Sequence, residues 1–150
     1  MEPELADILT QADRLLFVGV GNVLKSDDGV GAIISRQIIE RANIQSLTVE
    51  VSIENYIGKI NSMDPGAMVI LDCMELGASP GTCRMVKLED VEDLTFNTHN
   101  ISLSRLGDFF KYPTYVLGIQ PLSTAFGDEL SPPVREAALQ IINQINQQNN

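Results

Sequence analysis

The sequence predicts an α/β protein, a three-layer α/β/α sandwich on a five-stranded, mostly parallel sheet with one antiparallel strand. Two runs, 15–18 and 67–71, are continuously apolar, which is typical of strands buried on both faces. Amphipathic helices alternate with the strands, as a mainly parallel sheet requires. The loop over 74–81 is short and predicts no helix, so the strand that follows it should run antiparallel.

The first half of the chain alternates helix and strand by its apolar spacing. In the second helix, Val30, Ile34 and Ile38 recur at helical spacing. The third strand ends on Asp72, ahead of a loop rich in glycine and proline. The expected elements are helix 3–12, strand 14–20, helix 29–42, strand 47–53, helix 54–62 and strand 67–73.

The second half continues the same alternation with one weaker strand. The segment 82–88 is more polar than the other strands, which suits the edge of a sheet. Ser131 and Pro132 form a cap with proline in the first turn, so a last helix should begin there. The expected elements are strand 82–88, a turn or single helical turn over 89–94, helix 102–111, strand 115–121 and helix 132–147.

Composition narrows the class of protein. At 150 residues, the chain predicts one domain over 1–150 with a full core. Twenty acidic against ten basic residues give a net charge of -10, which argues against nucleic acid and anionic membrane partners. No apolar run approaches the ~20 residues of a membrane span, and the acidic start does not resemble a signal peptide. With only Cys73 and Cys83, we expect a cytoplasmic protein with reduced thiols.

The turn after the first strand is the richest part of the sequence in functional signals. Gly19 and Gly21 allow a tight backbone turn, and Asn22 follows them. Asp27 and Asp28 then stand at the expected start of a helix, where acids also serve as caps. A strand, a glycine turn and a helix start commonly form the active-site edge of α/β proteins.

Three side chains could share a metal ion at that edge. Asp28 follows the first strand, Asp72 ends the third, and His99 lies in a loop. A role as a simple turn residue at the strand end does not explain Asp72 well, because a carboxylate that ends a buried strand must be solvated, paired or bound to metal. Two carboxylates with one imidazole form a three-ligand set with open positions for zinc or nickel. Cys73 adjoins Asp72 in the strand, so its side chain should point to the opposite face.

Two other functions compete with metal-assisted hydrolysis. A dinucleotide-binding site is suggested by Gly19 and Gly21, but Leu24 replaces the third glycine, and carboxylates would repel a pyrophosphate. A phosphoacceptor receiver-like signalling domain would use Asp72 as the acceptor. In this chain the late strand ends with Gly118 to Pro121, where no lysine is present to contact a phosphoryl group. This absence argues against the receiver-like domain.

The motif order resembles the nickel-iron hydrogenase maturation endopeptidases. Their opening motif is similar to Gly-x-Gly-Asn, four residues, two acids, two residues and a glycine, and residues 19–31 fit it. The resemblance continues at 70–72, at 98–100 and at 117–121, and the last two segments resemble the branch that serves formate-hydrogenlyase-type enzymes.

This resemblance implies a function and a set of site residues. Members remove a C-terminal extension from the hydrogenase large-subunit precursor after nickel insertion, as an aspartate- and metal-dependent protease. By position, Asp28, Asp72 and His99 are the catalytic and metal-contacting residues. The metal is nickel presented by the substrate, for which zinc or cadmium can substitute in vitro, and no organic cofactor is expected. Supporting or substrate-contacting roles fall to Gly19, Gly21, Asn22 and Asp27.

Overall fold

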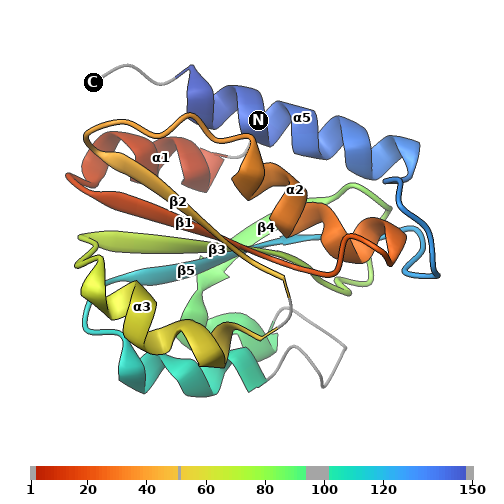
Figure 1. Cartoon of the computed structure of the whole chain (residues 1–150). Coiled ribbons are helices and arrows are strands. Elements are labelled where there is room, and N and C mark those ends of the chain that lie inside the picture. The colour runs from red at the N-terminus through yellow and green to blue at the C-terminus, as the bar shows by residue number, and fades with distance from the viewer. Residues whose placement is uncertain (1–2, 51, 94–101, 148–150) are drawn as a thin grey trace.

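The computed structural model describes residues 3–50, 52–93 and 102–147. A five-stranded sheet in the order β2-β1-β3-β5-β4 lies between two layers of helices (Figure 1). β4 pairs antiparallel with β5, and the other neighbouring strands pair in parallel. The predicted sandwich with one antiparallel strand is therefore confirmed. The strands are β1 (Leu15–Val20), β2 (Ile44–Val49), β3 (Ala67–Cys73), β4 (Cys83–Lys87) and β5 (Thr114–Ile119).

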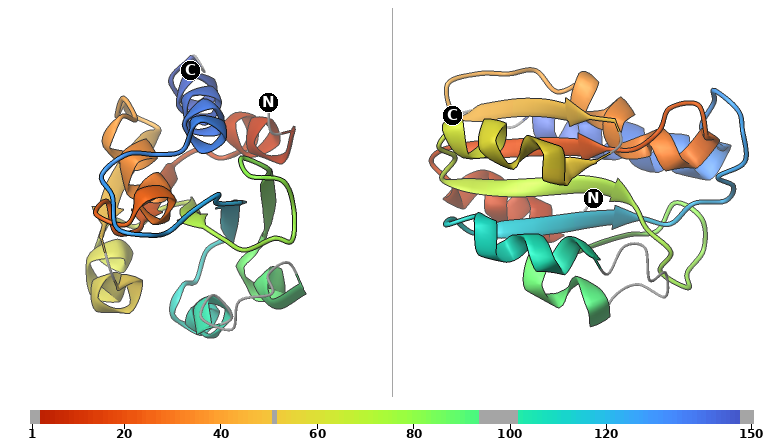
Figure 2. Two further views of the ribbon diagram at one scale, coloured as in Figure 1. Left: turned by 90° about the vertical axis from the view of Figure 1, so that its right-hand side faces the viewer. Right: turned by 60° about the horizontal axis from the view of Figure 1, so that its bottom comes forward.

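The helices divide between the two faces of the sheet, as Figures 1 and 2 show. One face carries α1 (Pro3–Gln11), α2 (Val30–Arg36) and α5 (Pro132–Asn146). The other carries α3 (Ile57–Ser62) and three 3₁₀ helices, of which η2 (Ile53–Tyr56) leads directly into α3. The other two are η3 (Leu88–Asp93) and η4 (Ser102–Phe109), and a further 3₁₀ helix, η1 (Ser26–Gly29), leads into α2.

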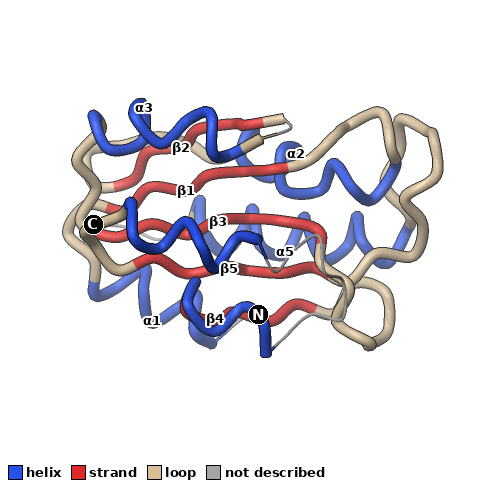
Figure 3. The backbone as a smooth tube through the Cα atoms, turned by 90° about the horizontal axis from the view of Figure 1, so that it is seen from below, coloured by secondary structure: helices blue, strands red, loops and turns tan. Residues whose placement is uncertain are grey.

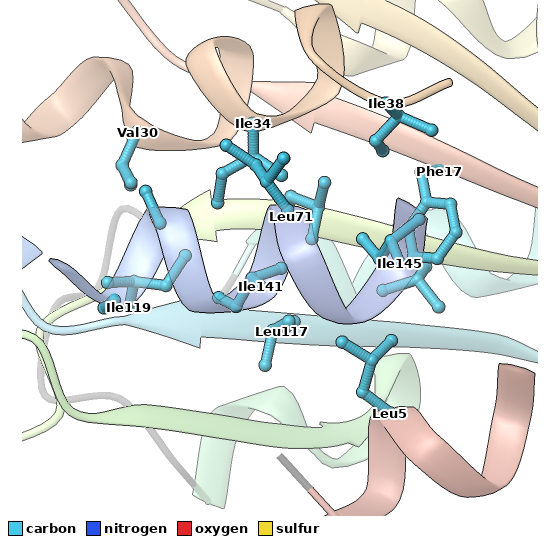
Figure 4. Packing of buried hydrophobic residues seen from close by; sticks show 14 of the residues in the cluster. Leu5, Phe17, Val30, Ile34, Ile38, Leu71, Leu117, Ile119, Ile141 and Ile145 are labelled. Carbon is cyan, nitrogen blue, oxygen red and sulfur yellow. The ribbon is translucent and has the colours of Figure 1, made fainter. Parts of the chain in front are cut away.

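Each face of the sheet has its own apolar core. Alternate residues of β3 point to opposite faces, so Val69 and Leu71 join one core while Met68 and Ile70 join the other. Figure 4 shows the first core, in which side chains of α2 and α5 pack against β1, β3 and β5. Because the central strands β1, β3 and β5 are covered on both faces, their carboxyl ends are held in fixed relative positions.

The second predicted helix is shorter in the structure. The expected helix over 29–42 is a short 3₁₀ helix followed by α2, which ends at Arg36. Beyond it, Asn146 of α5 accepts a hydrogen bond from the Ile39 N–H at 2.8 Å and donates to the Gln37 carbonyl at 2.9 Å. These two tertiary hydrogen bonds provide partners for backbone groups that a longer helix would otherwise have paired.

The second strand and the helix before β5 also differ from the prediction. β2 begins at Ile44, three residues before the expected 47–53, because its first residue pairs with Leu15 at the start of β1. The expected helix 102–111 is the 3₁₀ helix η4, and Gly107 with two serines gives that segment weak α-helical propensity. The remaining expected elements that lie in the described residues are present, with bounds that differ by a residue or two.

All four parallel strands point their carboxyl ends toward the same edge of the sheet. Figure 3 shows that the long loops gather at that edge, beyond the ends of β1, β3 and β5. Within the part of the chain that the structure describes, no helix is long and apolar enough to cross a membrane.

Candidate active site

Glycines let the start of α2 approach the ends of two strands. A side chain at Gly31 would overlap the backbone oxygens of Leu71 in β3 and Val20 in β1. Gly21 has φ of +147° and faces the backbone oxygen of Asp28, so any other residue there would be both strained and blocked. The glycine spacing thus brings the acidic turn against the carboxyl ends of β1 and β3.

The turn between β1 and η1 is built around Asn22 and Asp28. The Asn22 N–H donates a hydrogen bond to Asp28 Oδ2 at 3.1 Å. The side-chain oxygen of Asn22 in turn accepts from the Leu24 N–H at 2.9 Å, which closes a local turn. Asn22 therefore supports the turn and orients the Asp28 carboxylate.

Asp27 points away from Asp28 and is fully buried. Its Oδ2 accepts hydrogen bonds from the Leu122 N–H at 2.9 Å, the Ser123 N–H at 3.2 Å and the Ser131 hydroxyl at 2.8 Å. Its Oδ1 accepts from the Ser131 N–H at 2.8 Å. Burial alone would raise the pKa of Asp27, but these bonds, first those from Ser131, outweigh it and lower the pKa below its usual value.

The predicted capping role of Asp27 is wrong. The N-cap of η1 is Lys25 and that of α2 is Gly29, and neither position has a side-chain capping bond. Asp27 instead fastens the loop over 121–131, which follows β5, to the turn after β1. Figure 2 shows this loop wrapping around the end of the sheet beside η1 and α2.

Asp72 ends β3 and has a different environment. Burial raises the pKa of Asp72 well above its usual value, and the negative charge of Asp28 raises it further. Only the Cys73 N–H opposes this shift. The electrostatic effect of Asp28 on Asp72 agrees with the packing of η1, which holds Asp28, against β3. Proton or metal binding at Asp72 would relieve the repulsion between the two carboxylates.

The third predicted member, His99, lies outside the described residues. In the stretches 3–50, 52–93 and 102–147, no three His, Cys, Asp or Glu side chains form a group that could hold a metal ion. Cys73 packs in the core on the opposite face of β3, as predicted, and burial raises its pKa. A resident site with four protein ligands would therefore need groups beyond Asp28 and Asp72. The two carboxylates do supply the oxygen donors that an incoming divalent cation requires.

Two polar residues near this edge were missed as functional positions. Gln120 is buried, and its Oε1 accepts from the Leu76 N–H at 2.6 Å while its Nε2 donates to Glu75 Oε1 at 2.8 Å. It thereby holds the loop that leaves Asp72. Ser131 is the second, through its two bonds to Asp27. The sequence marks Ser131 only as the cap of the last helix, where it makes no side-chain capping bond, and gives no signal of its bonds to Asp27. Gln120, by contrast, stands in the quoted 117–121 motif.

A cavity lies at the opposite end of the sheet from Asp28 and Asp72. It has a volume of about 430 Å³ and is lined by residues of η4, the end of β4 and the start of β5, among them Lys87, Phe110 and Thr114. Because Asp28 and Asp72 stand at the carboxyl ends of the parallel strands, this cavity is separate from the predicted site.

Comparison with known proteins decides the family. A family model described as hydrogenase maturation protease, HycI, matches residues 50–148. The chain belongs to the hydrogenase maturation protease family. The resemblance predicted from the motifs is confirmed, and the match to HycI is consistent with the predicted branch. Asp72 and His99 lie inside the matched range, and the acidic turn with Asp28 precedes it.

Individual relatives agree with this family assignment. The chain is similar to the hydrogenase 3 maturation protease of Escherichia coli K12, with 27% identity over 124 residues that cover 79% of this chain and 80% of the relative. Its fold is similar to the crystal structure of HycI from Thermococcus kodakarensis, with a TM-score of 0.81 and 21% identity over 96% of this chain and 97% of that one. HybD from E. coli has a TM-score of 0.71 and 20% identity, over 88% and 89% of the two chains.

Proposed function

We propose that this protease removes the C-terminal extension of a nickel-iron hydrogenase large-subunit precursor after nickel has been inserted. Family membership supports the class of substrate. The observation that carries the proposal is the pairing of Asp28 and Asp72 at the carboxyl edge of the sheet, where burial and the Asp28 charge raise the pKa of Asp72. Shifted carboxyl pKa values of this kind mark functional sites.

In this proposal the metal arrives with the substrate. Asp28 and Asp72 contact the nickel of the precursor, and the resemblance assigns His99 as the third contact. The negative charge gathered at Asp28 and Asp72 attracts a cation, and metal binding removes the cost of placing two carboxylates near each other. Zinc or cadmium can occupy the same donors, and the reaction uses no organic cofactor.

The chemistry is hydrolysis of one peptide bond. A water oxygen bonds to the scissile carbonyl carbon, the carbon–nitrogen bond breaks, and the leaving nitrogen takes a proton. The substrate's nickel polarises the carbonyl or lowers the pKa of the water. Asp72, whose pKa is raised well above its usual value, is suited to accept the proton of the water and pass it to the leaving nitrogen when it is not engaged with the metal.

Asp28 has a positioning contact that suits a metal-binding role. The Asn22 N–H holds one carboxylate oxygen at 3.1 Å, which fixes the orientation of the group through a backbone bond. Gly21 and Gly31 keep this turn close to β3, where Asp72 stands. We expect the reaction in the cytoplasm, in keeping with a cysteine count of two, too few for a disulfide framework.

The test is a cleavage assay read by intact mass. Purified protein is incubated with nickel-loaded large-subunit precursor and, separately, with nickel-free precursor. We expect one shortened product from the loaded precursor only, and no cleavage by Asp72→Asn. Full cleavage by Asp72→Asn would remove Asp72 from the site. Labelling of Asp72 by acetyl phosphate without any precursor cleavage would instead favour the receiver-like alternative.

A further inference from the structure

Three large apolar side chains are exposed at the tips of two adjoining loops. Leu24 is 63% exposed in the turn after β1, and Leu122 and Phe126 are 60% and 89% exposed in the loop after β5. We refer to these residues as the loop-tip patch. Neighbouring exposed apolar side chains of this size mark an interaction surface.

The two loops are fastened to each other, so the loop-tip patch has a defined backbone. The Gly127 N–H donates to the Leu24 carbonyl at 3.0 Å, and the Ser26 N–H donates to the Gly127 carbonyl at 2.7 Å. These bonds form a parallel bridge between Lys25 and Gly127, which puts Leu24 and Phe126 at matched positions. A surface that is already ordered loses less conformational entropy when a partner docks.

Asp27 anchors the remaining part of the loop-tip patch. Its buried carboxylate accepts the Leu122 N–H at 2.9 Å and two bonds from Ser131, at the two ends of the loop. Leu122 is thus held by the residue next to Asp28. The Asp27 carboxylate therefore joins the loop over 121–131 to the turn that carries Asp28.

The loop-tip patch lies on loops at the same edge of the sheet as the candidate active site. Leu24 precedes Asp28 by four residues on one loop, and Leu122 follows Gly118 by four residues on the other. Gly118 is the register partner of Asp72 in the β3–β5 pair. Figures 2 and 3 show both loops at the carboxyl edge of the sheet. A polypeptide bound at Asp28 and Asp72 therefore has the loop-tip patch beside it.

Charge limits what can cover this surface. The chain has a net charge of -10, which opposes docking of a second copy and of an anionic lipid surface. The acidic Asp128 and Glu129 lie exposed next to the loop tip and add to this repulsion. Neither repulsion opposes the docking of an apolar polypeptide segment that carries no excess negative charge.

We propose that the loop-tip patch docks an apolar segment of the hydrogenase precursor beside the scissile bond. This inference rests on the proposed function and adds a recognition surface to it. Phe126 supplies the largest exposed area, and buried aromatic anchors of this kind dominate binding energies in protein interfaces. The loop-tip patch acts on substrate affinity, so its loss raises KM and leaves kcat nearly unchanged.

The experiment compares Phe126→Ala with Phe109→Ala. Phe109 is 52% exposed at the end of η4 that leads toward β5, so it is a matched exposed aromatic residue away from the carboxyl edge. Affinity for nickel-loaded precursor is measured in an Asp72→Asn background, where the substrate persists, and KM and kcat are measured in the otherwise unchanged enzyme. We expect Phe126→Ala to raise Kd and KM by at least about tenfold and Phe109→Ala to change neither.

The possible results separate this inference from the proposed function. Cleavage by the unaltered enzyme with equal KM for both variants would overturn the docking role and leave the proposed function standing. Absence of both binding and cleavage in the unaltered protein would overturn both. Sedimentation provides a further check, because a dimer that Phe126→Ala dissociates, without a change in precursor affinity, would show that a second copy covers the loop-tip patch.

Discussion

Asp27 is buried and Asp72 is half-buried at the same edge of the sheet, yet their pKa values shift in opposite directions. Burial raises the pKa of both groups. At Asp27, four hydrogen bonds from three residues outweigh burial. At Asp72, the charge of Asp28 adds to burial and a single N–H opposes them. The number of donors around each carboxylate separates a structural anchor from a reactive group.

The largest expected effect is on activity, at Asp72 and Asp28. Asp72→Asn and Asp28→Asn should each lower precursor cleavage by at least about 10²-fold, because each removes a proposed metal or proton-transfer group. Stability should stay the same or rise in Asp72→Asn, since burial already disfavours the charged form of that side chain. Cleavage rates and thermal unfolding by circular dichroism measure both parts. Loss of the fold in either variant would contradict the separation of roles.

His99→Ala should also abolish cleavage, because the motif resemblance assigns His99 as the third metal contact. The residue lies outside the described part of the chain, so this expectation rests on its position in the Thr98–Asn100 motif. The same cleavage assay and circular dichroism apply. Full activity of His99→Ala would leave the two carboxylates as the whole protein contribution to the site.

Asp27→Asn should have the reverse pattern and lower stability more than activity. An amide has one acceptor oxygen, so in either orientation its NH2 group faces at least one backbone N–H, that of Ser131 or those of Leu122 and Ser123, and the free energy of unfolding should fall by about 1–3 kcal/mol. Measurable cleavage should remain. Asp128→Asn is the matched control on the same loop, because that side chain is exposed. Complete loss of cleavage at unchanged stability would make Asp27 a direct participant in catalysis.

The stabilising effect of Asp27 should depend on pH in a defined direction. Its pKa is lower in the folded state than in the unfolded chain, so the unfolded state binds the proton more readily. The contribution is therefore complete above the unfolded pKa of about 3.9 and disappears as pH falls through the folded pKa. Urea unfolding from pH 7 to pH 3 should show the stability gap between the unaltered protein and Asp27→Asn narrowing toward acid. A gap that widens toward acid would reverse the assigned shift.

The smallest effect concerns metal removal from the isolated protein. With Asp28 and Asp72 as the described donors, dialysis against a mild chelator should leave the protein folded with an unchanged melting temperature. Added nickel, zinc or cadmium should bind weakly, because structural sites that bind tightly normally close with four ligands. Elemental mass spectrometry gives the metal content. One tightly held zinc per chain after dialysis would favour a resident-zinc peptidase over substrate-borne nickel.

Sequence patterns predicted the strands and the Asp28–Asp72 pair because their causes are local. The strand predicted over 67–73 from the apolar run 67–71 matches β3 residue for residue, and Asp72 is its last residue but one. Parallel pairing then brings the carboxyl end of β3 beside that of β1, and the turn after β1 leads to Asp28 in η1. The early end of α2 was missed, since the bonds from Asn146 that satisfy the following segment come from a helix more than a hundred residues away.

The role of Asp27 could not be predicted for the same reason. Its partner Ser131 is 104 residues distant in the chain, and a buried anchor and an exposed cap have the same local sequence. The exposure of Phe126 could not be predicted from the sequence pattern either, because an apolar residue in a loop can be buried or exposed. Both depend on how the loop after β5 returns to the turn after β1.

The most direct test is an NMR titration of the aspartate carboxyl carbons in the unaltered protein and in Asp28→Asn. We expect Asp27 to titrate below the usual aspartate pKa of about 3.9 in both proteins. Asp72 should titrate well above that value and move downward in Asp28→Asn, because one of the two causes of its shift has been removed. An Asp72 carboxyl that titrates at or below the usual value, and does not respond to Asp28→Asn, would contradict the paired-carboxylate site.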